Sequence, residues 1–286
     1  MAIVAGRGAL PRMLAEAQAA ARRALVLILF EDCEEPWMAA YPRQHHRFER
    51  VGALFRGLAA AGASEVVFAG TMQRPRLRPW TADRAALALL PRALWLLAQG
   101  DDAMLRGFAA VFERRGIRLT GPQALLGGTA DLAPGPLGAR RPDGRALGDA
   151  RRAAAIVSAL GPLDVGQGAV VARGLCLAVE AAQGTDLMLA QVAALPPHRR
   201  RRAPPPSGVL LKMPKPAQDR RLDLPTLGPE KVSAAHAAGL SAVVGLAGGC
   251  LVIDRSETAA VADALGLAVY GASAAELGLE RPEPSR

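Results

Sequence analysis

Short apolar runs alternate with helix-forming segments through the first half of the chain. Residues 2–6, 24–30 and 64–70 are apolar runs of strand length, and the first and third end at a glycine. Between and after them, apolar residues recur at the three- and four-residue spacing of an amphipathic helix. These helical segments cover residues 9–23, 50–62 and 101–116, and residues 117–121 follow as a further strand. Strands that alternate with helices predict a parallel sheet with helices on both faces, in which ligands bind at the carboxyl ends of the strands.

The pattern breaks at residues 131–145, which are rich in proline, glycine and arginine and have no periodicity. We therefore predict a linker there, between an N-terminal domain of residues 1–130 and a C-terminal domain of residues 146–286. The second domain is also expected to be α/β. Its predicted elements are a helix at 146–160, two strands within 168–181, a helix at 184–195, a basic loop at 198–206, and short strands at 207–212, 241–244, 250–253 and 267–270 with helices between them.

The charge of the chain favours anionic partners. It has 35 basic and 26 acidic residues among 286, a formal net charge of +9. The arginines are spread along the whole chain, and no basic stripe carries the interleaved aromatic residues of a single-strand binder, so we expect no nucleic acid partner. Three widely separated cysteines without a CxxC pair argue against a zinc site or a disulfide framework. The N-terminus lacks the pattern of a signal peptide, and a cytoplasmic protein is expected.

The loop Gly-Arg-Gly-Ala-Leu-Pro, residues 6–11, joins the first strand to the first helix. Glycine at Gly6 and Gly8 lets a backbone approach a phosphate, whose charge the helix N-terminus favours. The spacing is not the full dinucleotide fingerprint, because Pro11 interrupts it. Taken alone, the loop fits a tight turn as well as a ligand loop.

Polar residues gather at several strand and helix ends. Asp101 and Asp102 begin a helix, where they could cap it, and Asp102 could also face a ligand. Gln167 lies in a glycine-rich entry to a strand. Glu180 ends a strand, and Gly184, Thr185 and Asp186 begin the next helix. Thr185 or Asp186 would serve as an N-cap, yet this combination also suits phosphate and metal binding.

Residues 210–228 contain Lys212 and Lys215, two of only three lysines in the chain. A lysine ammonium is a compact point charge that adapts to a phosphate, although three lysines can also be placed by chance. Asp223 follows within a basic cluster that favours its ionised form, so it can bind a divalent cation, orient water, or pair with a neighbouring arginine. No signature of a serine hydrolase, zinc protease, P-loop protein or kinase is present.

Five motifs occur in order: GRGALP, GDDAMLR, LDVGQGAVV, VEAAQGTD and KMPKPAQDRRLDLPTLG. Together they make the chain resemble the LpxI-type UDP-2,3-diacylglucosamine pyrophosphatases of lipid A synthesis. The resemblance implies an N-terminal Rossmann-like domain, a C-terminal α/β domain of family-specific fold, and magnesium-dependent hydrolysis that releases UMP and 2,3-diacylglucosamine 1-phosphate (lipid X). The family's catalytic aspartate matches Asp223. Arg7 departs from the family pattern, because glycine commonly stands at its position.

On this resemblance Lys212 and Lys215 are expected to neutralise phosphate charge. Asp223, Glu180 and Asp186 are the candidate magnesium ligands. The expected substrate contacts are Gly6, Gly8, Leu10, Pro11, Asp102, Gln167, Gly184, Thr185, Lys212, Lys215, Gln218 and Thr226. A substrate with two acyl chains implies peripheral contact with the inner leaflet of the inner membrane, and a homodimer is possible. The alternative function is a non-catalytic nucleotide- or lipid-binding protein on the same fold.

Overall fold

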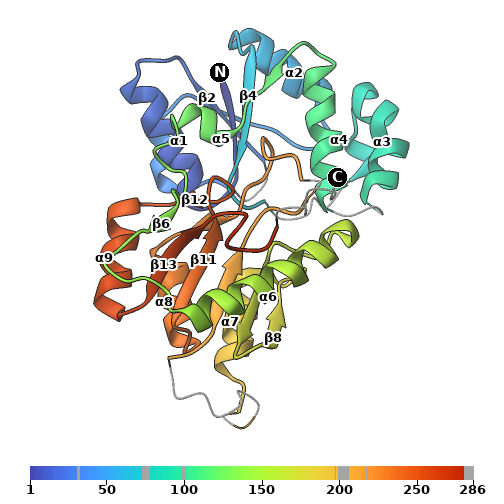
Figure 1. Cartoon of the computed structure of the whole chain (residues 1–286). Coiled ribbons are helices and arrows are strands. Elements are labelled where there is room, and N and C mark those ends of the chain that lie inside the picture. Colours follow the sequence, from blue (N-terminus) through green and yellow to red (C-terminus); the bar gives the residue numbers. More distant parts are fainter. Residues whose placement is uncertain are drawn as a thin grey trace, which may run out of the picture. The chain divides into compact units, whose positions relative to one another are not determined.

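The computed structural model describes residues 1–30, 33–72, 78–97, 101–196, 198, 206–216 and 218–279. The chain divides into two compact units (Figure 1). The N-terminal unit consists of Met1–Thr129 and Asp219–Asp223, and the C-terminal unit consists of Ala130–Gln218 and Leu224–Arg286. The chain therefore returns to the first unit for five residues before it completes the second.

The N-terminal unit is built on a five-stranded sheet in the order β3-β2-β1-β4-β5, and every neighbouring pair is parallel. The strands are β1 (Ala2–Ala5), β2 (Val26–Leu29), β3 (Arg43–His45), β4 (Glu65–Ala69) and β5 (Arg118–Leu119). The chain adds β2 and β3 on one side of β1 and then β4 and β5 on the other side. This strand order is that of a Rossmann-like sheet. The predicted parallel α/β fold of this half is confirmed.

Helices cover both faces of this sheet, because successive strand residues point to opposite sides. Ile3 and Leu27 pack with α1, whereas Val4 and Ile28 pack with α2 and α4. The helices are α1 (Ala9–Ala20), α2 (Val51–Ala60), α3 (Arg84–Leu97), α4 (Asp101–Glu113) and α5 (Pro122–Leu125), with short 3₁₀ turns η1 (Pro36–Ala40) and η2 (Pro79–Thr81). The sequence analysis missed α3, which contains a proline, and β3, which has no apolar run.

The C-terminal unit has a six-stranded mixed sheet in the order β6-β13-β11-β9-β7-β8. Its strands are β6 (Gly135–Pro136), β7 (Gly168–Ala172), β8 (Leu175–Val179), β9 (Val209–Lys212), β11 (Ala242–Leu246) and β13 (Ala268–Ala272). The pairs β9–β11 and β11–β13 are parallel, and the outer pairs are antiparallel. A separate pair of short parallel strands is formed by β10 (Thr226–Leu227) and β12 (Leu251–Val252).

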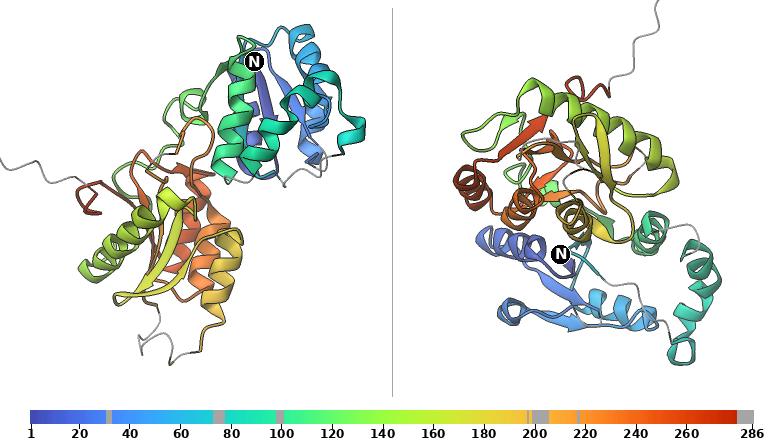
Figure 2. Two further views of the ribbon diagram at one scale, coloured as in Figure 1. Left: turned by 90° about the vertical axis from the view of Figure 1, so that its right-hand side faces the viewer. Right: turned by 90° about the horizontal axis from the view of Figure 1, so that it is seen from below.

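In the described part of this unit, four helices cover the two faces of the six-stranded sheet. They are α6 (Gly144–Leu160), α7 (Gly184–Ala193), α8 (Pro229–Ala237) and α9 (Arg255–Leu265). Helix α6 packs on one face and α7, α8 and α9 pack on the other, as the right-hand view of Figure 2 shows. The predicted two strands within 168–181 are confirmed as the hairpin of β7 and β8. Its turn, Arg173 and Gly174, has the positive φ angles that a tight hairpin turn requires.

Two predicted segments take a more specific form in the structure. The predicted linker at residues 131–145 includes β6, which pairs with β13, and Asp143, whose Oδ1 caps α6 by accepting the Ala146 N–H at 2.7 Å. A two-residue edge strand of glycine and proline has no periodicity to read, so the sequence did not predict β6. The predicted strand at 250–253 is confirmed as β12, which pairs with β10.

Among the described residues, no helix is both long and apolar enough to span a bilayer.

Candidate functional site

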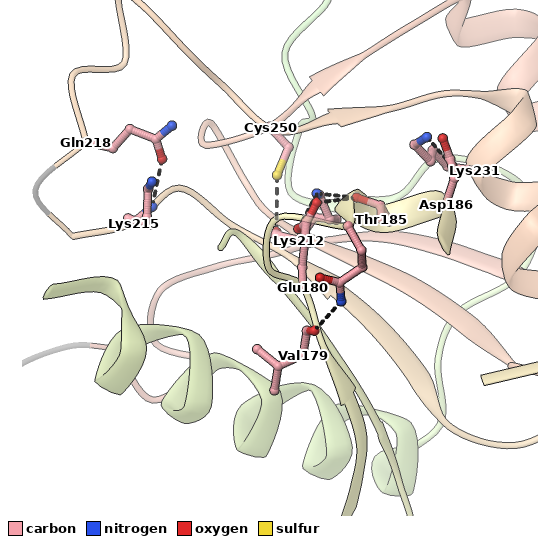
Figure 3. Close-up of polar contacts among 10 residues, drawn as sticks. Val179, Glu180, Thr185, Asp186, Lys212, Lys215, Gln218, Lys231 and Cys250 are labelled. Atoms are coloured by element: carbon pink, nitrogen blue, oxygen red, sulfur yellow. Dashed lines mark hydrogen bonds and ion pairs between the residues drawn. The ribbon is translucent and has the colours of Figure 1, made fainter. Parts of the chain in front are cut away.

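A buried cluster of polar side chains joins the ends of β8 and β9 in the C-terminal unit (Figure 3). The Lys212 ammonium donates to both Glu180 carboxylate oxygens, at 3.0 and 2.8 Å, and to the Thr185 hydroxyl at 2.8 Å. The Thr185 hydroxyl in turn donates to Glu180 Oε1 at 2.6 Å. The three acceptor atoms around the ammonium match its three N–H donors.

Both side chains of this ion pair are largely buried. The Lys212 side chain is 7% exposed and the Glu180 side chain 13%. Burial by itself raises the pKa of Glu180, but the adjacent Lys212 charge and the hydrogen bonds from Lys212 and Thr185 outweigh it, so the pKa lies below its ordinary value. Glu180 is therefore ionised at neutral pH.

Two glycines leave the space that the ion pair occupies. Strand β7 lies between β8 and β9, and its first residue, Gly168, is the register partner of Lys212. A Cβ at Gly168 would lie 2.8 Å from Glu180 Oε2 and 3.0 Å from Lys212 Cδ. A Cβ at Gly166, whose φ is +155°, would lie 2.1 Å from the Glu180 carbonyl oxygen. The sequence analysis missed both residues, although the Gly-Gln-Gly motif carried the signal.

Lys215 and the residues around it extend this cluster. The Lys215 ammonium forms an ion pair with Asp164, and its backbone N–H donates to Gln218 Oε1 at 2.9 Å. The Gln167 carbonyl accepts the N–H of Met213 at 2.9 Å. The structure therefore brings Gln167, Glu180, Thr185, Lys212, Lys215 and Gln218 into one region of the C-terminal unit.

Every lysine of the chain pairs with an acid of the C-terminal unit. Besides Lys212 and Lys215, Lys231 on α8 forms an ion pair with Asp186 on α7. Asp186 is 72% exposed at its side chain, so this pair lies at the surface. The predicted N-cap role of Thr185 or Asp186 is wrong, since Gln183 holds the N-cap position and Thr185 is the second residue of the helix.

The candidate magnesium ligands do not form one carboxylate cluster. Within the described ranges, no group of three or more histidine, cysteine, aspartate or glutamate side chains is placed to hold a metal ion. Glu180 is held by Lys212, and Asp186 by Lys231. Asp223 belongs to the N-terminal unit, whereas the other two belong to the C-terminal unit. Magnesium often needs only one or two protein carboxylates when substrate phosphates supply further oxygens.

Asp223 closes a short turn that is tied to the N-terminal unit. The N–H groups of Leu222 and Asp223 both donate to the Asp219 carbonyl, at 2.9 and 3.3 Å. Leu222 is buried and packs in the hydrophobic core of the N-terminal unit. Asp223 itself is half-buried. The apolar anchor thus fixes the position of the residue immediately before the candidate catalytic aspartate.

Charged residues next to Asp223 in the sequence stabilise the same turn. The Asp219 carboxylate accepts hydrogen bonds from the Arg221 guanidinium at 2.7–3.2 Å, and these hold the pKa of Asp219 below its ordinary value. Arg221 Nη1 also pairs with Glu113 at the end of α4, at 3.1 Å. Asp219 and Arg221 therefore hold the turn to α4.

The glycine loop after β1 is closed by the loop after β4. The N–H groups of Gly6 and Arg7 donate to the carbonyls of Ala69 and Thr71, at 2.8 and 2.9 Å. A Cβ at Gly6 would lie 2.6 Å from the Thr71 carbonyl oxygen, so glycine permits this contact. The Gly8 N–H donates to a carboxylate oxygen of Glu35 at 3.3 Å. Protein oxygens thus accept the N–H groups of Gly6 and Gly8, the two glycines expected to let the backbone approach a phosphate, and that of Arg7 between them.

The remaining predicted contacts are divided between the two units. Leu10 and Pro11 lie in the first turn of α1, Gly184 starts α7 with a φ of +75°, and Thr226 starts β10. Asp102 lies in the first turn of α4, but its side chain is outside the described part of the structure. The basic loop 198–206 also lies mostly outside the described residues.

The protein is therefore a two-unit α/β protein. It has a Rossmann-like parallel sheet in the first unit and a mixed sheet with a buried lysine–glutamate pair in the second. The comparisons with known proteins agree. Residues 1–128 match the LpxI N-terminal domain and residues 133–270 match the LpxI C-terminal domain. The chain is also 40% identical over 271 residues to the UDP-2,3-diacylglucosamine pyrophosphatase LpxI of Caulobacter vibrioides, covering 95% of this chain and 96% of the relative. The chain therefore belongs to the LpxI family.

Proposed function

We propose that this chain hydrolyses the pyrophosphate of UDP-2,3-diacylglucosamine to UMP and 2,3-diacylglucosamine 1-phosphate. The observation that carries the proposal is the near full-length match, at 40% identity, to a relative named for this substrate and activity. The residues of the C-terminal unit support it, since a cluster of lysines and carboxylates at strand ends suits a phosphorylated ligand.

In the proposed reaction, a water oxygen bonds to the α-phosphorus and the bond from that phosphorus to the bridging oxygen breaks. The bridging oxygen leaves with the sugar phosphate, and the proton of the water passes to a base. Asp223 is the proposed residue that orients this water or accepts its proton. Lys212 and Lys215 are the cations proposed to meet the phosphates, and each is paired with a carboxylate in the structure, Lys212 with Glu180 and Lys215 with Asp164.

Magnesium fits this proposal as a group shared with the substrate. Asp223 is the carboxylate proposed to hold it together with phosphate oxygens, because on the family resemblance it matches the catalytic aspartate. Bound to the pyrophosphate, the ion would offset the charge that develops on the phosphoryl group.

Metal removal tests the reaction directly. Purified protein with UDP-2,3-diacylglucosamine and Mg²⁺ is expected to release UMP, measured by chromatography, and EDTA is expected to abolish the release until excess Mg²⁺ restores it. In ¹⁸O-labelled water the label should enter UMP, because water attacks the α-phosphorus. Binding of the substrate without any UMP release would instead support the non-catalytic alternative.

Exposed aromatic side chains of the N-terminal unit support the proposed contact with a membrane. Trp80 in η2 is 82% exposed, and Leu87 and Trp95 on α3 are 49% and 61% exposed. The sequence of α3 contains two arginines and no acidic residue. Tryptophan and basic residues on one segment are typical of a helix that lies in the membrane–water interface.

We expect wild-type protein to sediment with vesicles of anionic phospholipid. A Trp80→Ala/Trp95→Ala variant should bind these vesicles about tenfold more weakly, because interfacial binding follows the buried apolar area. Leu163→Ala is the matched control, since this leucine is 71% exposed in the C-terminal unit. Equal binding by the tryptophan variant and wild type would place the membrane contact elsewhere.

A further inference from the structure

The N-terminal unit contains a cavity of about 550 Å³ at the carboxyl ends of β2 and β3. Leu29, the last residue of β2, and His45, the last residue of β3, both line it. Arg50, at the N-cap of α2, lines the side where that helix begins. This is the edge of a doubly wound sheet at which ligands bind, yet the cavity contains none of the predicted site residues.

The polar lining of the cavity is mainly basic. Arg47 and Arg50 are both exposed, and His45 and His46 stand beside them. Among the described lining side chains, Glu34 is the acidic residue, and it pairs with His45 and with Arg43, each at 2.9 Å. Arg47 and Arg50 place two guanidinium groups in the described lining.

The start of α2 does not itself supply the anion site. The Gly52 N–H donates to Asp83 Oδ2 at 2.7 Å, so a carboxylate of the protein already sits at this helix N-terminus. The case for a ligand rests on the cavity and its arginines, whose planar donor forks match phosphate oxygens.

The other lining groups indicate what the anion is attached to. Leu29, Phe30 and Ala53 provide apolar surface. The volume falls within the range of sites for small organic molecules and exceeds the need of a bare phosphate. Glu34 offers carboxylate oxygens that can accept hydrogen bonds from sugar hydroxyls.

We infer that this cavity binds a nucleoside phosphate, with the phosphate on Arg47 and Arg50 and the sugar hydroxyls toward Glu34. The inference rests on the proposed function only for the choice of uridine nucleotides. The same chemistry has two possible sources, the nucleotide half of the substrate or a separate free nucleotide.

The histidines provide a direct readout of binding. The chain has four histidines, and two of them, His45 and His46, line this cavity. Burial and the nearby His45 lower the pKa of His46, which also bonds Gln44 at 3.0 Å. A phosphate nearby favours the imidazolium, so binding of UMP should raise that pKa.

The experiment is NMR of the imidazole nitrogens in ¹⁵N-labelled full-length protein, with UMP, inorganic phosphate or uridine added. UMP should shift the His45 and His46 signals saturably and leave that of His236 in place. Inorganic phosphate and uridine should each shift the His45 and His46 signals only at much higher concentration than UMP. Saturable binding of UMP that moves neither cavity histidine would overturn the inference, and so would the absence of any UMP binding.

Variants assign the binding to the cavity. Arg47→Ala and Arg50→Ala should each weaken UMP binding about tenfold, since each removes a charge-assisted hydrogen bond. Arg12→Ala is the control, because Arg12 is exposed on α1, pairs with Glu16, and its loss changes the net charge equally. An equal loss of affinity in the control would show a general charge effect and overturn the inference.

Kinetics then separate the two sources of nucleotide. A raised KM in the Arg50→Ala variant identifies the cavity as the site of the substrate's nucleotide half. Loss of inhibition by added UMP, at an unchanged KM, identifies a separate nucleotide. Both outcomes support nucleotide binding in the cavity. The NMR experiment tests this binding even if the protein fails to hydrolyse UDP-2,3-diacylglucosamine.

Discussion

The Asp223→Asn variant is expected to release UMP about 10²- to 10⁴-fold more slowly than wild type while it unfolds at the same temperature. Asparagine keeps the size of the side chain and removes only its charge. The turn around it persists, because Leu222 packs in the N-terminal core and Arg221 binds Asp219 and Glu113. Turnover and circular dichroism during heating measure the two parts of this result.

A matched control and two titrations sharpen the test. Glu230→Gln removes one exposed carboxylate seven residues further along and should retain full turnover. If Asp223 is a metal ligand, the residual rate of the Asp223→Asn variant should climb with Mg²⁺ concentration. If it is a base, that rate should climb with pH, because hydroxide replaces the missing proton acceptor. Full activity of the variant under ordinary conditions would contradict both roles.

The sheet of the N-terminal unit could be predicted because its central strands are buried on both faces. Residues 24–30 and 64–70 are apolar enough to be recognised without any partner. Strand β3, with the sequence Arg-Gln-His, has no such pattern and is a strand only because β2 offers it a pairing edge. The same holds for β6, which depends on β13.

The candidate site was predictable as a set of residue types and not as a set of contacts. Lys212 and Glu180 are 32 positions apart, so only the strand order β9-β7-β8 reveals that they meet. The pairing of Asp219 with Arg221 was accessible in principle, since they are only two positions apart. The cavity beside Arg47 and Arg50 was not, because it is made by the ends of two strands and the start of a helix.

The second large effect is expected from Glu180→Gln, which should lower the free energy of unfolding by about 3–5 kcal/mol. Lys212 is 5% exposed and would keep its charge in a buried place without the carboxylate that neutralises it. Chemical denaturation followed by circular dichroism measures the loss. Asp186→Asn is the comparison, because its pair with Lys231 lies at the surface, and it should cost less than about 1 kcal/mol.

The pH dependence of stability follows from the same contact. Folding lowers the pKa of Glu180 below its ordinary value of 4.5, so its contribution is fully present above that value. The contribution is lost as the pH falls through the lowered pKa of the folded state. Wild type should therefore lose its advantage over Glu180→Gln on acidification below about pH 4.5, whereas the difference should stay constant at higher pH.

A double variant separates structural and chemical roles of the lysine. Glu180→Gln combined with Lys212→Met removes both buried charges and should recover most of the lost stability, because no uncompensated ion remains. The glutamine oxygen can still accept the Thr185 hydroxyl. If this stable protein turns over substrate as wild type does, Lys212 serves only the fold; if it is stable but slow, Lys212 also acts on the substrate. A single Glu180→Gln variant as stable as wild type would contradict the expected cost of the buried charge.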